Sequence, residues 1–268
     1  MPRFFRYGLI ACCVAAGAPS FAAGPTVPLC FERQEVLPWR TLDGGGLNFE
    51  LLGEVARRVG IAFDYQSMPW KRCLAQVKAN QVSGAFAVSF SREREALGVY
   101  PGTLGHTRGA EDRADPDKRM HVDRYVLVRR KGGRVDWDGK HFANVDGRIG
   151  FQLGYSVGDF LRAQNVPVDE GSQQADELLQ KLLAGRLVAA ALGGGDAVRL
   201  THTPYGKDIE VLPVPLVEKP YYLILSHAFV AQHPDLAARI WNAVEAVRTS
   251  PAYRRREREL AGQQGAVH

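Results

Sequence analysis

The sequence predicts an α/β protein of two lobes, each a sheet flanked by helices, with a hinge between them. Strands and helices alternate as β-α-β-α-β over residues 27–89, an order that implies a parallel sheet with right-handed crossovers. A second α/β unit follows over residues 148–192. The length of 268 residues suits two modest domains. Ligands of open α/β sheets bind at the carboxyl ends of strands, so we expect a cleft there.

The first unit has the better marked elements. Apolar residues recur at every fourth position from Leu47 to Val59, and Gly60 follows as a stop, which is typical of an amphipathic helix. A second helix is expected from Trp70 to about residue 79. The expected strands cover residues 27–31, 61–65 and 85–89.

The second unit begins after a Gly-, Pro-, Asp- and Arg-rich loop at residues 100–119. Residues 187–192 are wholly apolar, as in a strand buried on both faces. We expect the chain to return to the first lobe near residue 221 and to end in a long helix from Pro234. The predicted lobes are therefore 24–122 plus 221–268, and 123–220, with hinges near 119–124 and 214–220.

Residues 1–22 read as a secretory signal. Arg3 and Arg6 precede a short apolar run, and Ser20-Phe21-Ala22 has small residues where a signal peptidase cuts. A lipobox-like Leu9–Cys12 is the alternative. Cleavage near Ala22 predicts a periplasmic protein.

The charge pattern argues against a nucleic-acid partner. The formal net charge is +5 and falls to +3 once the signal is removed, because only Arg3 and Arg6 are lost. The excess is spread along the chain, except at Arg254–Arg258, where we expect a solvated helix face.

Two cysteines remain in the exported chain, Cys30 and Cys73. They either form one disulfide, as oxidising compartments allow, or are two buried apolar side chains. Neither the cysteines nor the seven histidines have metal-ligand spacing, and the glycine triplets at 44–46 and 193–195 lack the Lys-Ser/Thr of a phosphate loop. We expect no cofactor.

An anion site is expected where the strand at 85–89 runs out into hydroxyls and arginines. Ser89, Ser91, Arg92 and Arg94 stand there, just before a predicted helix start. Hydroxyls, free N–H groups of a helix start and an Arg fork all donate hydrogen bonds to a carboxylate. Residues 154–156 occupy the corresponding strand end in the second unit.

Most of the mature chain resembles the type II periplasmic solute-binding proteins of family 3, the amino-acid transporter class. Matching motifs are the helix opening at Gly46–Leu51, the tryptophan at Trp70 and the Ala-Gly-Arg strand at 184–190. The family's Ser-Ile-Thr-x-x-Arg motif reads Ser89–Arg94 here, and its Gly-Thr-Thr turn reads Gly154–Ser156.

The resemblance implies a carboxylate held by Arg94, Ser89 and Ser156, with Arg92 as a neighbour. It also exposes a departure. The acid that takes the ligand's amino group falls on Gly193 or Gly194, and Asp196 is the nearest acid that could replace it. Implied partners are a small carboxylate ligand, such as an amino acid, and the membrane permease of an ABC transporter, with the protein acting as a monomer.

Other readings of the same residues remain. Gly154–Gly158 fits the Gly-x-Ser-x-Gly nucleophile elbow, which would make Ser156 the nucleophile of a hydrolase. The resemblance also admits a dehydratase-like enzyme or a sensor for a membrane partner. Trp39 is expected to line the cleft as a stacking platform, and Tyr155 either lines it or packs in the core.

Overall fold

A computed structural model of the protein describes residues 24–103 and 114–265, with side chains as far as Leu260. The signal expected at residues 1–22 and residues 104–113 of the expected loop lie outside the described residues. Within them, none of the helices combines the length and apolar composition of a membrane span.

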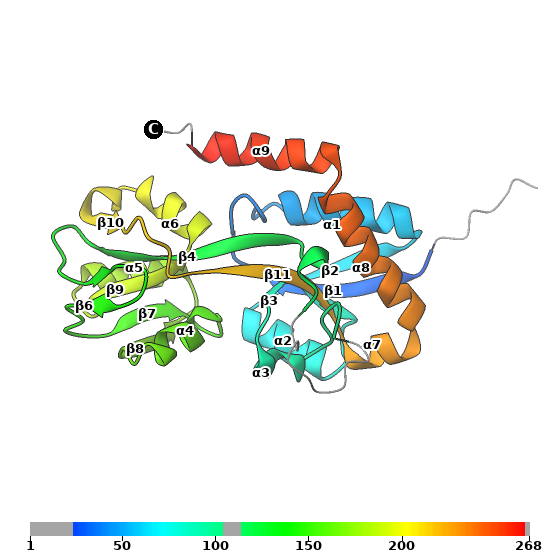
Figure 1. The fold of residues 1–268 in the computed structure, drawn as a ribbon, viewed down its shortest axis with the longest axis horizontal. Helices are drawn as coiled ribbons and strands as arrows, with labels where there is room; N and C mark the ends of the chain where they lie inside the picture. The colour runs from blue at the N-terminus through cyan, green and yellow to red at the C-terminus, as the bar shows by residue number, and fades with distance from the viewer. Residues whose placement is uncertain (1–23, 104–113, 266–268) are drawn as a thin grey trace, which may run out of the picture.

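The chain folds into two lobes joined by two long strands (Figure 1). The strands that run through both lobes are β4 (His121–Arg130) and β11 (Val217–Leu225). The first lobe contains β1 (Thr26–Glu32), α1 (Leu47–Val59), β2 (Ala62–Met68), α2 (Trp70–Lys78), β3 (Gly84–Ser89), α3 (Arg92–Glu95), the 3₁₀ helix η1 (Pro116–Lys118), α7 (His227–Gln232), α8 (Pro234–Arg248) and α9 (Pro251–Gly265). The second lobe contains β5 (Asp136–Trp137), β6 (Phe142–Ala143), β7 (Ile149–Gln152), α4 (Val157–Ala163), β8 (Val168–Ser172), α5 (Ala175–Leu183), β9 (Ala189–Gly193), α6 (Gly194–Thr201), the 3₁₀ helix η2 (Gly206–Asp208) and β10 (Ile209–Val211).

The main sheet has the strand order β2-β1-β3-β11-β4-β9-β7-β8, with β10 added beside β4. β1 pairs in parallel with β2 and β3, and β7 pairs in parallel with β8 and β9, as in βαβ units, whereas the short β5 and β6 form a separate antiparallel pair. β11 pairs antiparallel with β4 over residues 217–221 and with β3 over residues 221–225. Because β4 and β11 are shared, the sheets of the two lobes are hydrogen-bonded into one.

Each lobe has its own apolar core. In the first lobe, α1 and α8 cover one face of the sheet around Phe86, and α2 covers the other face around Val88. In the second lobe, α4 packs with Phe151 on one face and α5 with Val128 on the other. The buried residues of each cluster come either from 27–120 and 222–253 or from 125–217, and the half-buried Tyr155 packs against one cluster of each lobe. The boundaries at 122/123 and 220/221 remain predictions.

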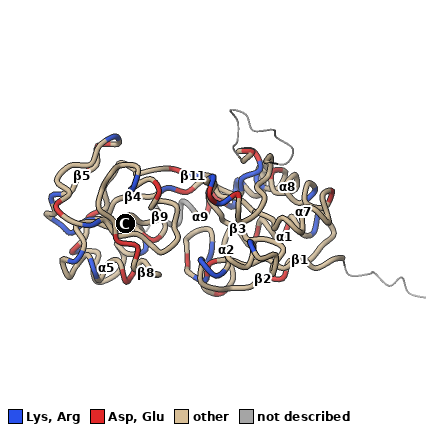
Figure 2. Tube along the Cα trace, turned by 90° about the horizontal axis from the view of Figure 1, so that it is seen from below, with Lys and Arg blue, Asp and Glu red and all other residues tan. Residues whose placement is uncertain are grey.

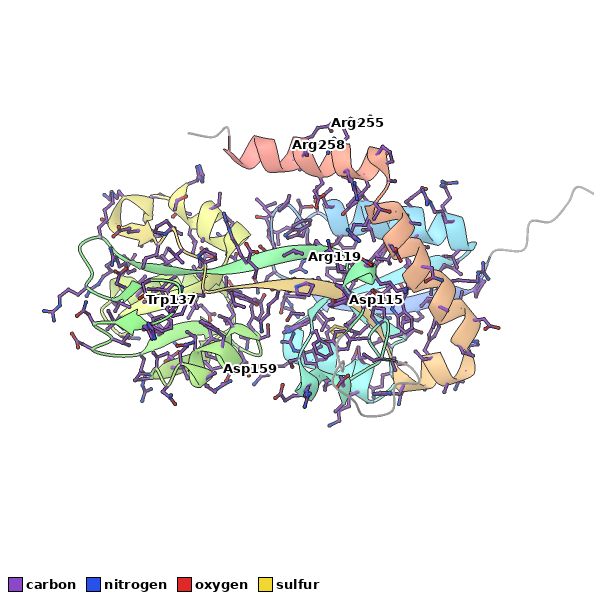
Figure 3. All side chains as sticks on the ribbon, in the orientation of Figure 1. Asp115, Arg119, Trp137, Asp159, Arg255 and Arg258 are labelled. Atoms are coloured by element: carbon purple, nitrogen blue, oxygen red, sulfur yellow. A yellow bond between two sulfur atoms is a disulfide. The ribbon has the colours of Figure 1, made fainter. Side chains whose placement is uncertain are left out.

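A disulfide joins Cys30 of β1 to Cys73 of α2, so it ties a helix to the central strand of the first lobe. Charged residues of both signs are dispersed over the two lobes (Figure 2). On α9 the side chains of Arg254, Arg255 and Arg258 are exposed, and Figure 3 shows Arg255 on the side that faces away from the lobes.

Two helices differ from the expectation. α6 begins at Gly194, inside a glycine triplet that reads as a loop, and α7 precedes the expected last helix. Glycine lowers helix propensity by about 1 kcal/mol relative to Ala, but burial of Ala197 and Leu200 in the second core favours α6.

Candidate functional site

A cavity of about 60 Å³ lies between the lobes, enough for a few water molecules. Both lobes and both connecting strands contribute to its wall. The lining residues are Glu32, Val36, Trp39, Arg40, Asn48, Trp70, Ala87, Ser89, Arg94, His121, Asp123, Tyr125, Tyr155, Gly193, Asp196 and Tyr221.

Arg94 lines this cavity, although it belongs to a surface helix of a single turn. Its side chain turns inward and is 8% exposed. Nη1 donates to Ser89 Oγ at 2.7 Å and to the Ser89 carbonyl at 3.1 Å. Its guanidinium lies 6.0 Å from the ring centre of Trp70. The end of β3 therefore fixes the position of a buried cation.

The second lobe meets Arg94 through the turn before α4. Arg94 Nη2 donates to the Gly154 carbonyl at 2.8 Å. Ser156 is the N-cap residue of α4, and its Oγ lies 2.7 Å from Ser89 Oγ. Gly154 has a φ of 79°, a left-handed conformation that glycine adopts without strain. Hydroxyls of both lobes and one guanidinium thus converge at a single point.

Arg94 has no carboxylate partner among the described residues, since no Asp or Glu oxygen of theirs lies within 4.0 Å of it. A buried charge is costly unless it is paired. The cluster of Arg94, Ser89 and Ser156 presents hydrogen-bond donors from two lobes and no anion. Chemically it is suited to take a carboxylate, whose oxygens would replace the contacts that these groups make with one another.

Aromatic rings form a stack along the cavity wall. The Trp39 ring lies 4.0 Å from that of His121 at an interplanar angle of 13°, and His121 stacks on Tyr221 at 5.0 Å. Trp39 lines the cavity, and one face of its ring is covered by His121. Burial lowers the pKa of His121 to about 3, so this ring is neutral at neutral pH. Tyr155 also lines the cavity, between the cores of the two lobes.

Three carboxyl groups line the same cavity. Asp196 in α6 is 5% exposed and lies 3.5 Å from Arg199. Burial raises its pKa to about 6, against the lowering effect of Arg199. Burial likewise raises the pKa of Asp123 to about 6. For Glu32, burial raises the pKa, while the charge of Arg40 and backbone N–H groups lower it.

The structure thus brings Ser89, Arg94, Trp39, Tyr155 and Asp196 to one cavity wall, and Ser156 contacts Ser89 from the other lobe. Arg92 is exposed and does not line the cavity. Cavity residues that the sequence reading did not single out are Glu32, Arg40, Asn48, Asp123 and His121. Glu32 had a usable signal, because it ends a strand beside the one that carries Ser89.

The nucleophile reading of Ser156 finds little support in its surroundings. Within the described part of the chain, Ser156 Oγ hydrogen-bonds with Ser89 and with the Tyr125 hydroxyl, and no histidine donates to or accepts from it. A serine nucleophile needs an adjacent base. The described residues also hold no cluster of His, Cys, Asp and Glu that could bind a metal ion.

No protein-family model matches the sequence, and no curated protein matches it significantly. Many solved structures match the fold. A histidine kinase sensor domain with similarity to periplasmic binding proteins is 13% identical with a TM-score of 0.69, covering 90% of this chain and 97% of that one. The ancestral amino acid-binding protein AncCDT-1, a precursor of cyclohexadienyl dehydratase, is 12% identical with a TM-score of 0.63 over 88% and 94% of the chains.

The substrate-binding protein of an amino acid ABC transporter is similar over 86% of this chain and 96% of that one, with 13% identity and a TM-score of 0.60. The fold is that of the type II periplasmic binding proteins. At this level of identity the likeness extends to the fold alone. The structures that share this fold include binding proteins, a sensor and a precursor of an enzyme. The fold therefore does not determine the function, which depends on the residues of the cavity.

Proposed function

We propose that the protein is a periplasmic solute-binding protein. It captures a small carboxylate-bearing ligand, an amino acid or a related acid, between its lobes and delivers it to the permease of an ABC transporter. The observation that carries the proposal is the convergence of Arg94, Ser89 and Ser156 from two lobes at a buried cation that has no carboxylate partner among the described residues.

Ligand entry requires the lobes to part, because direct contacts join the lobes beside the cavity of about 60 Å³. Those contacts include the Arg94–Gly154 hydrogen bond and an ion pair of 3.8 Å between Lys71 and Glu170. The hinge would lie in β4 and β11, near 119–124 and 214–220, where only two strands connect the lobes. When the lobes close on the ligand, they form a joint surface that a permease can recognise.

The affinity this site can supply is sufficient for a transport protein. Each charge-assisted hydrogen bond contributes about 1.5–3 kcal/mol. Together, three such bonds and apolar contact with Trp39 would supply the ~8 kcal/mol of binding free energy that corresponds to a micromolar Kd.

A thermal-shift screen of amino acids, polyamines and small carboxylates tests the proposal. We expect carboxylates to raise Tm, because a ligand that binds only the folded state stabilises it. Arg94→Ala should lose this shift, whereas Arg92→Ala, in the same helix turn but exposed, should keep it. A full shift in Arg94→Ala, or no shift with any carboxylate in the unaltered protein, would contradict the proposal.

Two rivals share the fold. A sensor would bind the ligand equally well. It differs from a transport protein in its membrane partner, which would be a signalling protein and not a permease. An enzyme, either a hydrolase using Ser156 or a dehydratase-like activity, would return an altered ligand. We expect the ligand to be recovered unchanged after prolonged incubation. Ester hydrolysis that disappears in Ser156→Ala would favour the hydrolase instead.

A further inference from the structure

A second guanidinium group without a carboxylate lines the same cavity. Arg40 is 4% exposed, and no carboxylate of the described residues lies within 4.0 Å of it. Its backbone is held by a reciprocal pair of hydrogen bonds with Val36. Nε donates to the Gln34 carbonyl, and the guanidinium lies 5.9 Å from the ring centre of Phe31. The described residues offer no hydrogen-bond partner to its two terminal nitrogens.

Two neutral polar side chains near Arg40 are unpartnered as well. Both amide atoms of Asn48 are buried without a hydrogen bond, and so is Nδ1 of His121. Both residues line the cavity. Trp39 links them, because its carbonyl accepts from the Asn48 backbone N–H at 2.9 Å and its ring stacks on His121. We call Arg40, Asn48 and His121 the Arg40 subsite.

The acids of the cavity, in contrast, have partners. Asp196 lies 3.5 Å from Arg199, and Asp123 accepts the Arg124 backbone N–H at 2.7 Å. Backbone N–H groups of residues 33, 34 and 70 donate hydrogen bonds to the carboxylate of Glu32. The charges of Glu32 and Arg40 also attract each other, although the two groups do not form an ion pair. The unmet demand in the Arg40 subsite is therefore mainly for hydrogen-bond acceptors, because the Arg40 guanidinium and the Asn48 amide N–H groups are donors, while Asn48 Oδ1 can accept one bond in return. A guanidinium fork fits a carboxylate best, because two parallel N–H groups meet its two oxygens.

We propose that the ligand carries two carboxylates, one bound at Arg94 and the second in the Arg40 subsite. The ligand class is then a short dicarboxylate, either a dicarboxylic acid or an acidic amino acid. This inference rests on the proposed function, since it assigns the second half of the same cleft. Arg40 determines which carboxylate ligands are preferred, and Arg94 determines whether carboxylates bind at all.

Isothermal titration with matched ligands tests the inference, using L-glutamate against L-glutamine, L-aspartate against L-asparagine and glutarate against butyrate. We expect the dicarboxylate of at least one pair to bind about tenfold to a hundredfold more tightly, as one charge-assisted hydrogen-bonded pair provides. In Arg40→Gln this preference should fall to within a few-fold, while binding of the singly charged ligands persists. The control Arg33→Gln lies in the same loop but is exposed, and should keep the preference.

The outcomes separate the two proposals. If an amide or monocarboxylate binds as tightly as its dicarboxylate partner, the Arg40 subsite is overturned and the binding protein stands. If no carboxylate binds, both are overturned. The comparison of ligands on the unaltered protein needs no variant, so it remains decisive even where Arg40→Gln does not fold.

Discussion

At the scale of single residues, Asp196 is the clearest case of a group whose chemistry is set by burial. In the folded protein the pKa of the Asp196 carboxyl is about 6, because burial disfavours the carboxylate more strongly than the charge of Arg199 favours it. In the unfolded chain the same group ionises near its ordinary value of 3.8. Between these values the folded state binds more protons, so this group's contribution to stability is lost as the pH rises from about 4 to 6.

Asp196→Asn should therefore gain stability relative to the unaltered protein as the pH rises. At pH 3, below both pKa values, Asp196 is mostly neutral in the folded and the unfolded state, so the two free energies of unfolding should be similar. At pH 7 only the aspartate is charged, and the variant should be favoured by up to about 3 kcal/mol, at 1.4 kcal/mol for each pKa unit. Urea unfolding of the ligand-free protein at both pH values measures the difference.

The matched control for this measurement is Asp64→Asn, an exposed aspartate on β2. Because its side chain is in water, this substitution gives the background against which Asp196→Asn is compared. A pH dependence of Asp196→Asn no larger than that background would show that Asp196 has the same pKa in the folded and unfolded states, which would contradict a pKa raised by burial.

Residues that follow a strand end were predictable from the sequence, and those placed by loop packing were not. Ser89 and Arg94 stand where a parallel strand ends at the cavity between the lobes. Arg40 lies in a loop with hydroxyl, glycine and charged residues that read as solvated. In the folded protein its guanidinium lies beside the Phe31 ring and in the wall of the cavity between the lobes, and no local pattern encodes such a position.

At the scale of elements, regular periodicity decided what could be predicted. α1 has the bounds that its fourfold apolar repeat predicts, and Gly60 ends it in a left-handed conformation. β11 begins at Val217, four residues before the expected strand, because its outer part pairs with β4 although it contains Pro220. α6 was missed since its glycines mask a helix that tertiary packing stabilises.

The disulfide between β1 and α2 gives a prediction at this scale. Both sulfurs belong to fully buried residues, so reductant reaches them only when the lobe opens. Reduction should lower the free energy of unfolding by about 2–4 kcal/mol, the usual effect of releasing a cross-link in the unfolded chain. Denaturant titrations with and without a thiol reductant measure this loss.

The double variant Cys30→Ala, Cys73→Ala should lose a similar amount and no longer respond to reductant. Two cysteines that are reduced in the purified protein would give an unaltered protein that is itself indifferent to reductant, and that result would contradict the cross-link.

At the scale of the whole molecule, two strands and a few contacts hold the lobes together. β4 and β11 form the only sheet pairing between them in the described residues. Beyond the cavity, α6 of the second lobe approaches the loop before α1 of the first. α9 extends over this region from α8 (Figure 1), fixed to α1 by an ion pair of 3.1 Å between Arg256 and Glu50. How far the lobes can close thus depends on how closely α6 can approach the loop before α1.

Gly195 in α6 sets that distance. A Cβ at this position would lie 2.1 Å from the carbonyl oxygen of Leu37 in the first lobe, a backbone atom that has no side-chain freedom to yield. Gly195→Ala should therefore hold the lobes apart. We expect ligand affinity to fall at least about tenfold, as a binding-competent closed state becomes rare, while each lobe keeps its own core and the free energy of unfolding changes little.

Small-angle scattering with and without ligand, together with calorimetric titration, would measure this effect. The unaltered protein should become more compact when ligand is added, and Gly195→Ala should not. Gly53→Ala is the matched control, because it is also a helix glycine but a Cβ there meets nothing within 4 Å. If Gly195→Ala closes and binds like the unaltered protein, contact between α6 and Leu37 does not limit closure, and the hinge must bring the lobes together by another approach.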